Sequence, residues 1–220
     1  PGYRYQIDAT IADIYLISES DRSRIVGRPV VYIVIDVFSR MVTGIYVGFE
    51  GPSWVSAMMA LANTVSDKVE YCRQFDIEIS YDEWPVQGLP SVILADKGEL
   101  NGTKIEVFAE ATGMRIENAP ARRGDAKGIV ERYFRTLQDG FKPYLSGIVE
   151  PHMSRKMGGH DYRQDATLTL SEFTKIIIAG VLWHNNFHTL SKYDRSELMP
   201  GDIPAVPLML WNWGLANMTG

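Results

Sequence analysis

Three acidic residues stand at positions that suit the binding of divalent cations. Asp8 lies inside an alternating β-prone segment, Asp96 directly follows the apolar run Val92–Ala95, and Glu131 lies within an amphipathic helical pattern. Carboxylate oxygens are ligands that Mg²⁺ prefers, and strands and helices can hold them rigidly. Because Mg²⁺ takes only one or two carboxylates per ion, three suffice for two ions when a substrate phosphate supplies further ligands.

Each acid alone also has an ordinary structural explanation. Asp8 fits a surface acid on an edge strand, and Asp96 fits the first residue of a turn. Glu131 fits a helix-surface acid paired at i, i+4 spacing with Lys127 and Arg135. The combination favours the metal site, because the three acids come from separate rigid elements, as the ligands of a hard cation do.

The segments around these acids predict a mixed sheet. Residues Tyr3–Ile17 alternate as a strand does, and Val30–Ile35 with Met41–Phe49 predicts a hairpin whose first strand is apolar throughout and therefore central. Two more short strands are predicted at Ser91–Ala95 and Met114–Asn118. Since consecutive strands joined by short turns pair antiparallel, this order excludes a simple doubly wound fold.

Helical patterns follow the hairpin. Ser53 is a candidate N-cap for a helix whose apolar residues recur from Trp54 to Val69. Further helices are predicted at Thr103–Ala111, at Asp125–Gln138 and from Leu170 to about His188, the last with a Thr169–Glu172 capping box. The fold class is therefore α/β: three antiparallel strands followed by parallel strands, with helices on both faces and a helical insertion or extension.

The expected organisation is a core over residues 1–140, an insertion loop with C-terminal helices packed on the core over 141–200, and a tail over 201–220. Glycines and charges from Gly140 to Asp165 indicate a mobile insertion. The alternation in Trp211-Asn212-Trp213 indicates the first strand of a truncated following domain. The chain opens without Met, which indicates a piece of a longer protein.

Composition and charge narrow the class of protein. Apolar residues make up 45% of the 220 residues and no apolar run approaches the ~20 needed to span a bilayer, so we expect a globular intracellular domain. The single cysteine, Cys72, excludes a disulfide framework and a Cys-rich zinc site. The net charge is −5, yet Met114–Arg163 holds ten Lys and Arg against six Asp and Glu. That basic half suits phosphate contacts on one face, although chance clustering explains the charge equally well.

Two histidines and two aromatic residues need separate interpretation. His184 and His188 have a spacing that can bind zinc on a helix, but no glutamate base lies between them and no third ligand is evident. Packing or a DNA-facing role is therefore favoured for both. Tyr133 and Phe134 share the apolar stripe of their helix, so we expect them in the core.

Four blocks of the sequence resemble the core of the DDE recombinases, the superfamily of retroviral integrases and phage Mu-type transposases, which has an RNase H-like fold. They are Tyr5–Thr10, Val34–Arg40, Leu94–Gly98 and Lys127–Arg132. Within the superfamily the chain is most similar to the TnsB family. The supporting features are the segment Arg24–Pro29, the 34 residues between Asp96 and Glu131, and the helix end Trp183–Asn186.

The resemblance implies a chemistry for the three acids. Asp8, Asp96 and Glu131 match the metal-binding catalytic acids, which hold two Mg²⁺ ions, with Mn²⁺ as a substitute and Asp8 bridging both. The implied enzyme is a DNA transposase that hydrolyses DNA at the transposon 3′ ends and then transfers the freed 3′-hydroxyls into target DNA. Asp36 matches a position that varies in the family, so we interpret it as structural.

Basic residues near the third acid are candidates for contact with DNA phosphates. Lys127 is the favoured one, because it lies one turn before Glu131, and its alternative role is an i, i+4 salt bridge. Integrases have a stretch containing Asn-Pro before this helix, whereas this chain has arginines there. The other candidates are Arg122, Arg123, Arg132 and Arg135.

The resemblance also implies partners and a location. They are transposon-end DNA, target DNA, further copies of the chain in a synaptic complex, a TnsA-type nuclease and a TnsC-type ATPase, with no membrane, in the bacterial cytoplasm and on the nucleoid when DNA is bound. The alternative function is a non-catalytic nucleic-acid-binding domain of the same fold. A phosphoacceptor signalling domain is disfavoured, because its strands and helices alternate from the start, unlike Tyr3–Phe49.

Overall fold

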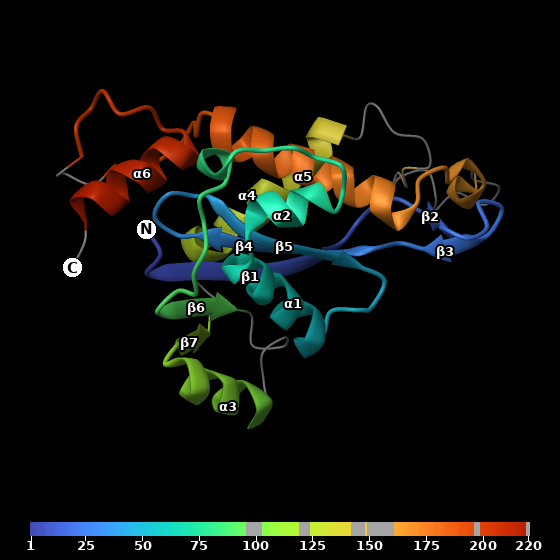
Figure 1. Cartoon of the computed structure of the whole chain (residues 1–220), viewed down its shortest axis with the longest axis horizontal. Helices are drawn as coiled ribbons and strands as arrows, with labels where there is room; N and C mark the ends of the chain where they lie inside the picture. The colour runs from blue at the N-terminus through green and yellow to red at the C-terminus, as the bar shows by residue number, and fades with distance from the viewer. Residues whose placement is uncertain (96–102, 119–123, 142–147, 149–160, 196–198, 219–220) are drawn as a thin grey trace.

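The computed structural model in Figure 1 describes residues 1–95, 103–118, 124–141, 148, 161–195 and 199–218. Side chains are described for these residues except 103–106, 118, 124–127, 131, 138, 139 and 141. A sheet lies at the centre of the molecule, and both chain ends lie toward the same end of its long axis (Figure 1). No helix within the described ranges combines the length and the apolar character that crossing a membrane requires.

The central sheet has five strands in the order β5-β4-β1-β6-β7. β4 pairs antiparallel with both β1 and β5, whereas β6 runs parallel to β1 and to β7. The strands are β1 (Arg4–Ile11), β4 (Val30–Asp36), β5 (Val42–Gly48), β6 (Val92–Ala95) and β7 (Arg115–Asn118). The predicted mixed sheet of antiparallel and then parallel strands is confirmed, and β1 is its middle strand.

The predicted central strand of the hairpin is confirmed by its burial. All seven residues of β4 are buried, because the strand has β1 on one edge and β5 on the other and is covered on both faces. In β5, a Cβ atom added to Gly44 would lie 2.5 Å from the carbonyl oxygen of Ala60. Glycine at this position therefore allows the first helix to pack closely on the sheet.

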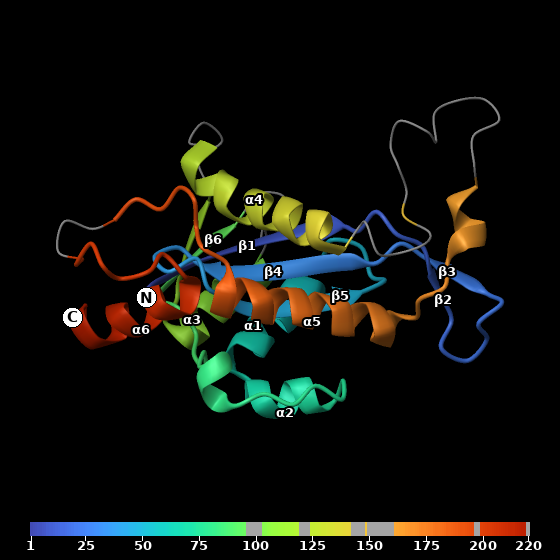
Figure 2. The same ribbon diagram turned by 90° about the horizontal axis from the view of Figure 1, so that it is seen from above.

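Helices cover both faces of the sheet (Figure 2). α1 and α2 lie on one face, whereas α4 lies on the other and contacts β1 and β4. α5 packs beside α4 and against β5, and α6 follows it at the end of the described chain. The helices are α1 (Trp54–Val65), α2 (Lys68–Arg73), α3 (Thr103–Thr112), α4 (Gly124–Phe141), α5 (Leu170–Phe187) and α6 (Pro207–Asn217).

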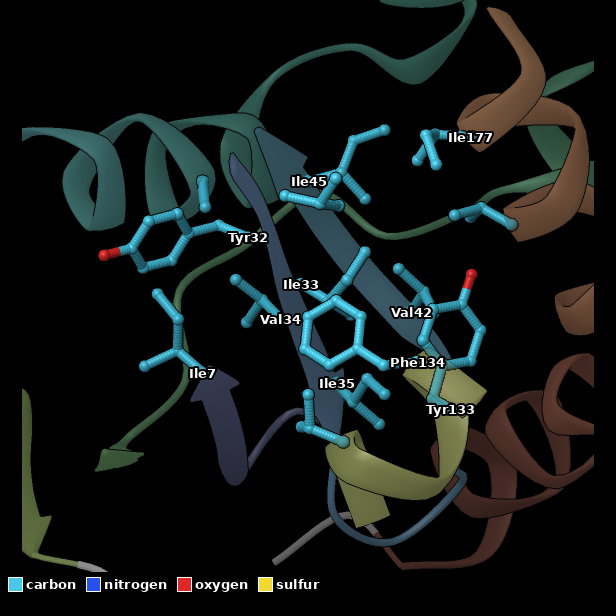
Figure 3. Close-up of a cluster of buried hydrophobic side chains, with 14 of the residues drawn as sticks. Ile7, Tyr32, Ile33, Val34, Ile35, Val42, Ile45, Tyr133, Phe134 and Ile177 are labelled. Carbon is cyan, nitrogen blue, oxygen red and sulfur yellow. The ribbon is translucent and has the colours of Figure 1, made fainter. Parts of the chain in front are cut away.

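Two predicted helix caps are confirmed. The Ser53 hydroxyl accepts a hydrogen bond from the backbone N–H of Ser56 at the start of α1. At the start of α5, Thr169 and Glu172 form the reciprocal bonds of a capping box. Buried side chains of α1, α4 and α5 pack with those of the strands in one core. In it, Ile33 and Ile35 of β4 lie near Phe134 of α4 (Figure 3).

Two predicted elements are divided in the structure. The strand expected over Tyr3–Ile17 ends at Ile11. Ala12 N–H still bonds to Pro29 O, but proline has no N–H to donate in return, so the pairing with β4 stops there. The chain continues as β2 (Leu16–Ile17), which pairs with β3 (Ile25–Gly27) in a separate sheet of two strands. The helix expected to reach Val69 ends at Val65, because Asp67 caps the next helix by accepting from the N–H groups of Val69 and Glu70.

The strand expected at Trp211–Trp213 is wrong, since these residues lie in helix α6. The buried residues of this segment recur at helical spacing, and the proline occupies the first turn, where it needs no N–H partner. The alternating tryptophans are therefore two positions of one helix, with Trp211 buried and Trp213 stacked on Phe38 at 6.3 Å. The buried positions of α6 are Pro207, Leu210, Trp211 and Gly214.

Most of the insertion expected between Gly140 and Asp165 lies outside the described residues. Within it, Ile148 forms an isolated antiparallel bridge with Ile14. The short 3₁₀ helix η3 (Tyr162–Asp165) is capped by Asp161, whose side chain accepts from Arg163 N–H. A second 3₁₀ helix, η1 (Tyr81–Glu83), follows α2.

Candidate functional site

Asp8 lies in the middle strand of the sheet. It is opposite Ile33 of β4, and its side chain is half-buried. Its Oδ1 atom accepts a hydrogen bond of 2.9 Å from the backbone N–H of Ala9. The explanation of Asp8 as a surface acid on an edge strand is therefore wrong, because β1 has a neighbour on each side.

The strand before Asp96 ends beside the segment of β1 that contains Asp8. β6 runs parallel to β1 with Leu94 in register with Gln6, and it ends one residue later at Ala95. The carboxyl ends of parallel neighbours lie at the same edge of a sheet. Asp96 is the next residue in the chain and lies outside the described residues.

Helix α4 supplies the position of the third acid. Val130 and Phe134 of this helix are buried against the sheet, whereas Leu137 packs on Gly180 of α5 and Tyr133 on His184 of α5. At 100° per residue, position 131 lies about 160° around the helix from position 133. It therefore lies on the flank of α4 away from α5, which is the flank toward β1. The side chain of Glu131 is not among those described.

Asp8 offers donor atoms of the kind that a hard divalent cation prefers. Asp8 offers carboxylate oxygens on a rigid strand, with one oxygen oriented by the Ala9 N–H. Among the side chains that the structure describes, no cluster of three Asp, Glu, His or Cys residues is found. Asp96 and the side chain of Glu131 lie outside that set.

Asp36 has the structural role expected of it. The carboxylate is fully buried at the end of β4, where Oδ2 accepts from both the backbone N–H and the hydroxyl of Ser39 at 2.7 Å. Oδ1 accepts from Gly2 N–H at 3.0 Å. These bonds close the β4–β5 hairpin and hold the start of the chain against it.

The basic candidates are only partly described. Arg132 and Arg135 are exposed on α4, and Arg132 lies near the guanidinium of Arg40 in the β4–β5 hairpin. Lys127 belongs to α4, but its side chain is not among those described. Arg122 and Arg123 lie outside the described residues.

The packing interpretation of His184 is confirmed. Its ring is buried, with Nε2 3.0 Å from Arg40 O, and it stacks on His188 at a centroid distance of 5.3 Å. Burial lowers the pKa of His184 to about 4, so its ring is neutral at pH 7. Tyr133 and Phe134 are buried, as expected.

A cavity that the sequence did not indicate lies on the other flank of α4. Its volume is about 380 Å³, and its lining includes Arg40, Arg132, His184, His188 and Lys192. These residues come from the hairpin, from α4, from the end of α5 and from the segment after α5. No local pattern joins segments so far apart in the chain, although Arg132 was singled out for its charge.

Comparison with known proteins gives concordant results. Residues 6–147 match the family model described as the TnsB C-terminal domain. The transposon Tn7 transposition protein TnsB of Escherichia coli is 54% identical over all 220 residues, which cover 31% of its own length. The transposase for transposon Tn552 of Staphylococcus aureus is 25% identical over 151 residues, covering 68% of this chain and 28% of that protein. The chain thus spans less than a third of each of these relatives.

The fold is also similar to that of a solved integrase core. The catalytic core domain of BIV integrase superposes with a TM-score of 0.52 at 10% sequence identity, covering 99% of both chains. The RNase H-like architecture expected from the sequence is thereby confirmed.

Proposed function

Because the chain belongs to the family of TnsB C-terminal domains, we propose that it is the catalytic core of a DNA transposase. In the proposed reaction, water attacks a phosphodiester at each transposon end and the 3′ oxygen leaves. The freed 3′-hydroxyl then attacks a phosphodiester of the target DNA and displaces its 3′ oxygen. The observation that supports this proposal most is the half-buried Asp8 in the middle strand, beside the end of the strand that precedes Asp96.

Asp8, Asp96 and Glu131 are proposed as the residues that would hold two Mg²⁺ ions. Bound there, the ions would increase the acidity of the attacking hydroxyl and stabilise the leaving oxygen. The chain's contribution is rigid placement of the ligands. The Ala9 N–H holds one oxygen of Asp8 at 2.9 Å, and β1 is fixed by a strand on each edge.

DNA is proposed to lie along the start of α4. Arg122, Arg123, Lys127, Arg132 and Arg135 are within or just before this helix, and their charges would contact phosphates without reading sequence. The exposed side chain of Arg135 supports this role, whereas Arg132 lines the cavity on the other flank of α4. Residues 1–140 would form the catalytic core, with the later helices packed on it.

The proposed partners follow from the family. They are transposon-end and target DNA, further copies of the chain in a synaptic complex, a TnsA-type nuclease and a TnsC-type ATPase in the bacterial cytoplasm. The alternative function is a DNA-binding domain of the same fold without catalysis. This alternative predicts that replacing the acids leaves DNA cleavage and joining by the complete transposition complex unchanged.

The test replaces the acids one at a time. Asp96→Asn and Glu131→Gln should abolish Mg²⁺-dependent cleavage of a transposon-end duplex and should weaken Mn²⁺ binding measured by electron paramagnetic resonance. Glu110→Gln, an exposed acid on α3, is the matched control and should change neither. Cleavage by Asp96→Asn at the parental rate would reject the catalytic assignment and favour the DNA-binding alternative.

A further inference from the structure

The cavity beside α4 continues into a second one, and together they form a groove between α4 and α5. The first has a volume of about 380 Å³ and the second about 330 Å³, and both are lined by Tyr133, Thr136 and His184. The second extends along Leu137 and Gly180 toward the end of α4. Position 131 lies on the opposite flank of the helix, so the groove and the proposed catalytic acids are separated by α4 itself.

The end of the groove nearest the β4–β5 hairpin is positively charged. Among the side chains that the structure describes, Arg40, Arg132 and Lys192 line it together with one carboxylate, Asp194. The Arg40 residue adopts a left-handed backbone conformation with φ of 64°, and its guanidinium donates to Val37 O. Burial lowers the pKa of Arg40 and the neighbouring Arg132 adds to this effect, whereas Tyr193, Asp36 and Asp194 act in the opposite direction. Both histidines of the groove have pKa values lowered by burial and add no charge at pH 7.

A series of aromatic rings leads from the core to the mouth of the groove. Tyr133 packs edge-on against His184 at 4.7 Å, His184 stacks on His188 at 5.3 Å, and His188 lies 5.2 Å from the ring of Trp183. Tyr133 and His184 are buried, His188 is half-buried, and Trp183 is 51% exposed. A large aromatic side chain is thus held at the surface beside a cluster of cations.

We propose that this groove binds a segment of single-stranded DNA, with phosphates at Arg40, Arg132 and Lys192 and a base stacked on Trp183. A positively charged groove with an aromatic platform is the arrangement that binds unpaired strands without sequence preference. A duplex carries its phosphates on a convex surface, whereas a single strand can enter a groove and turn its bases toward the protein. The proposal rests on the proposed function, and it assigns the groove to a strand other than the one that reacts at the acids.

The test measures binding rather than cleavage. A fluorescently labelled oligothymidylate of about 12 nucleotides is titrated with the chain in EDTA, and anisotropy gives the affinity at several salt concentrations. Trp183→Ala should weaken binding about tenfold, and Trp183→Phe should retain most of the affinity, because a ring remains. Lys192→Glu should also weaken binding, and it should reduce the slope of log K against log salt by about 0.7 for each phosphate that the protein no longer neutralises.

Two exposed residues outside the groove lining provide matched controls. Arg24→Glu makes the same charge change in the β2–β3 hairpin, at the opposite end of the molecule, and Tyr81→Ala removes an exposed ring of η1. Both should stay within about twofold of the parent. If the Trp183 and Lys192 variants also do so, the proposal is wrong. Loss of binding to poly-glutamate with unchanged DNA binding would instead assign the groove to an acidic peptide.

Because the assay contains no divalent metal, it separates this proposal from the catalytic one. Strand binding that depends on Trp183 supports the groove even if no cleavage is ever observed. Cleavage that depends on Asp96, together with strand binding that ignores Trp183 and Lys192, overturns the groove and leaves the transposase assignment intact.

Discussion

The side-chain amide of Asn185 pairs with the backbone of Val42 as a neighbouring strand would. Its Oδ1 accepts from Val42 N–H at 2.9 Å, and its Nδ2 donates to Val42 O at 3.1 Å. Asn185 is fully buried, so these bonds are shielded from water. These bonds join α5 to the start of β5, beside the hairpin that carries Arg40. They therefore fix the position of α5, which forms one side of the groove.

Replacement of Asn185 should therefore destabilise the fold. Asn185→Ala leaves the Val42 N–H without its partner in a buried site, which we expect to lower the free energy of unfolding by about 1–3 kcal/mol. Urea unfolding followed by circular dichroism measures the change. Asn212→Ala, at an exposed position of α6, should stay within about 0.5 kcal/mol of the parent. Equal stability of the two variants would mean that the amide pairing contributes nothing.

The contact between α4 and α5 depends on a glycine. A Cβ atom on Gly180 would lie 2.5 Å from Leu137 Cδ1. Alanine in place of glycine within a helix ordinarily stabilises by about 0.5–1 kcal/mol, but here the methyl group must displace Leu137. In the parent chain, Gly180→Ala should therefore not raise the free energy of unfolding. In the Leu137→Ala background, where the obstructing side chain is absent, the same substitution should raise it by about 0.5–1 kcal/mol. A double-mutant cycle measures the coupling, and additive effects would contradict the close contact.

Acid should weaken the fold through His184. The unfolded chain takes up a proton on this ring as the pH falls below 6.5, whereas the folded chain does so only near its pKa of about 4. The unfolded state binds more protons between these values, so stability is lost as the pH falls through this window, by up to about 3 kcal/mol. His184→Gln can still donate to Arg40 O but does not titrate. Unfolding free energies at pH 7 and 4.5 should differ less in the variant, and parallel pH profiles would refute this account.

How far the sequence predicts this protein depends on whether a feature is local. The apolar run Val30–Ile35 indicated a central strand and Thr169 with Glu172 indicated a helix start, because each pattern is contained within one element. The two alternating tryptophans predict a strand, whereas helix Pro207–Asn217 forms because its buried positions recur at helical spacing, a pattern that only the packing of the segment reveals.

The same dependence on local pattern decides which functional residues the sequence predicts on either flank of α4. Asp8 could be proposed as a ligand because its block of sequence resembles a known core, and the structure places it in the middle strand. The groove on the other flank could not be found, because Arg40, Arg132 and Lys192 meet only after β4, α4 and α5 have packed together.

Lys127 is one turn before Glu131 on α4, and its two possible roles predict different results. If it contacts a phosphate, Lys127→Ala should slow the joining of transposon ends to target DNA several-fold and reduce the salt slope of duplex binding by about 0.9. The free energy of unfolding should change by less than about 0.5 kcal/mol. The control is Lys175→Ala on α5, which removes an exposed ion pair between Lys175 and Asp76. It should leave the joining rate unchanged. An unaltered joining rate and salt slope at moderate ionic strength would instead assign Lys127 to an intrahelical salt bridge with Glu131.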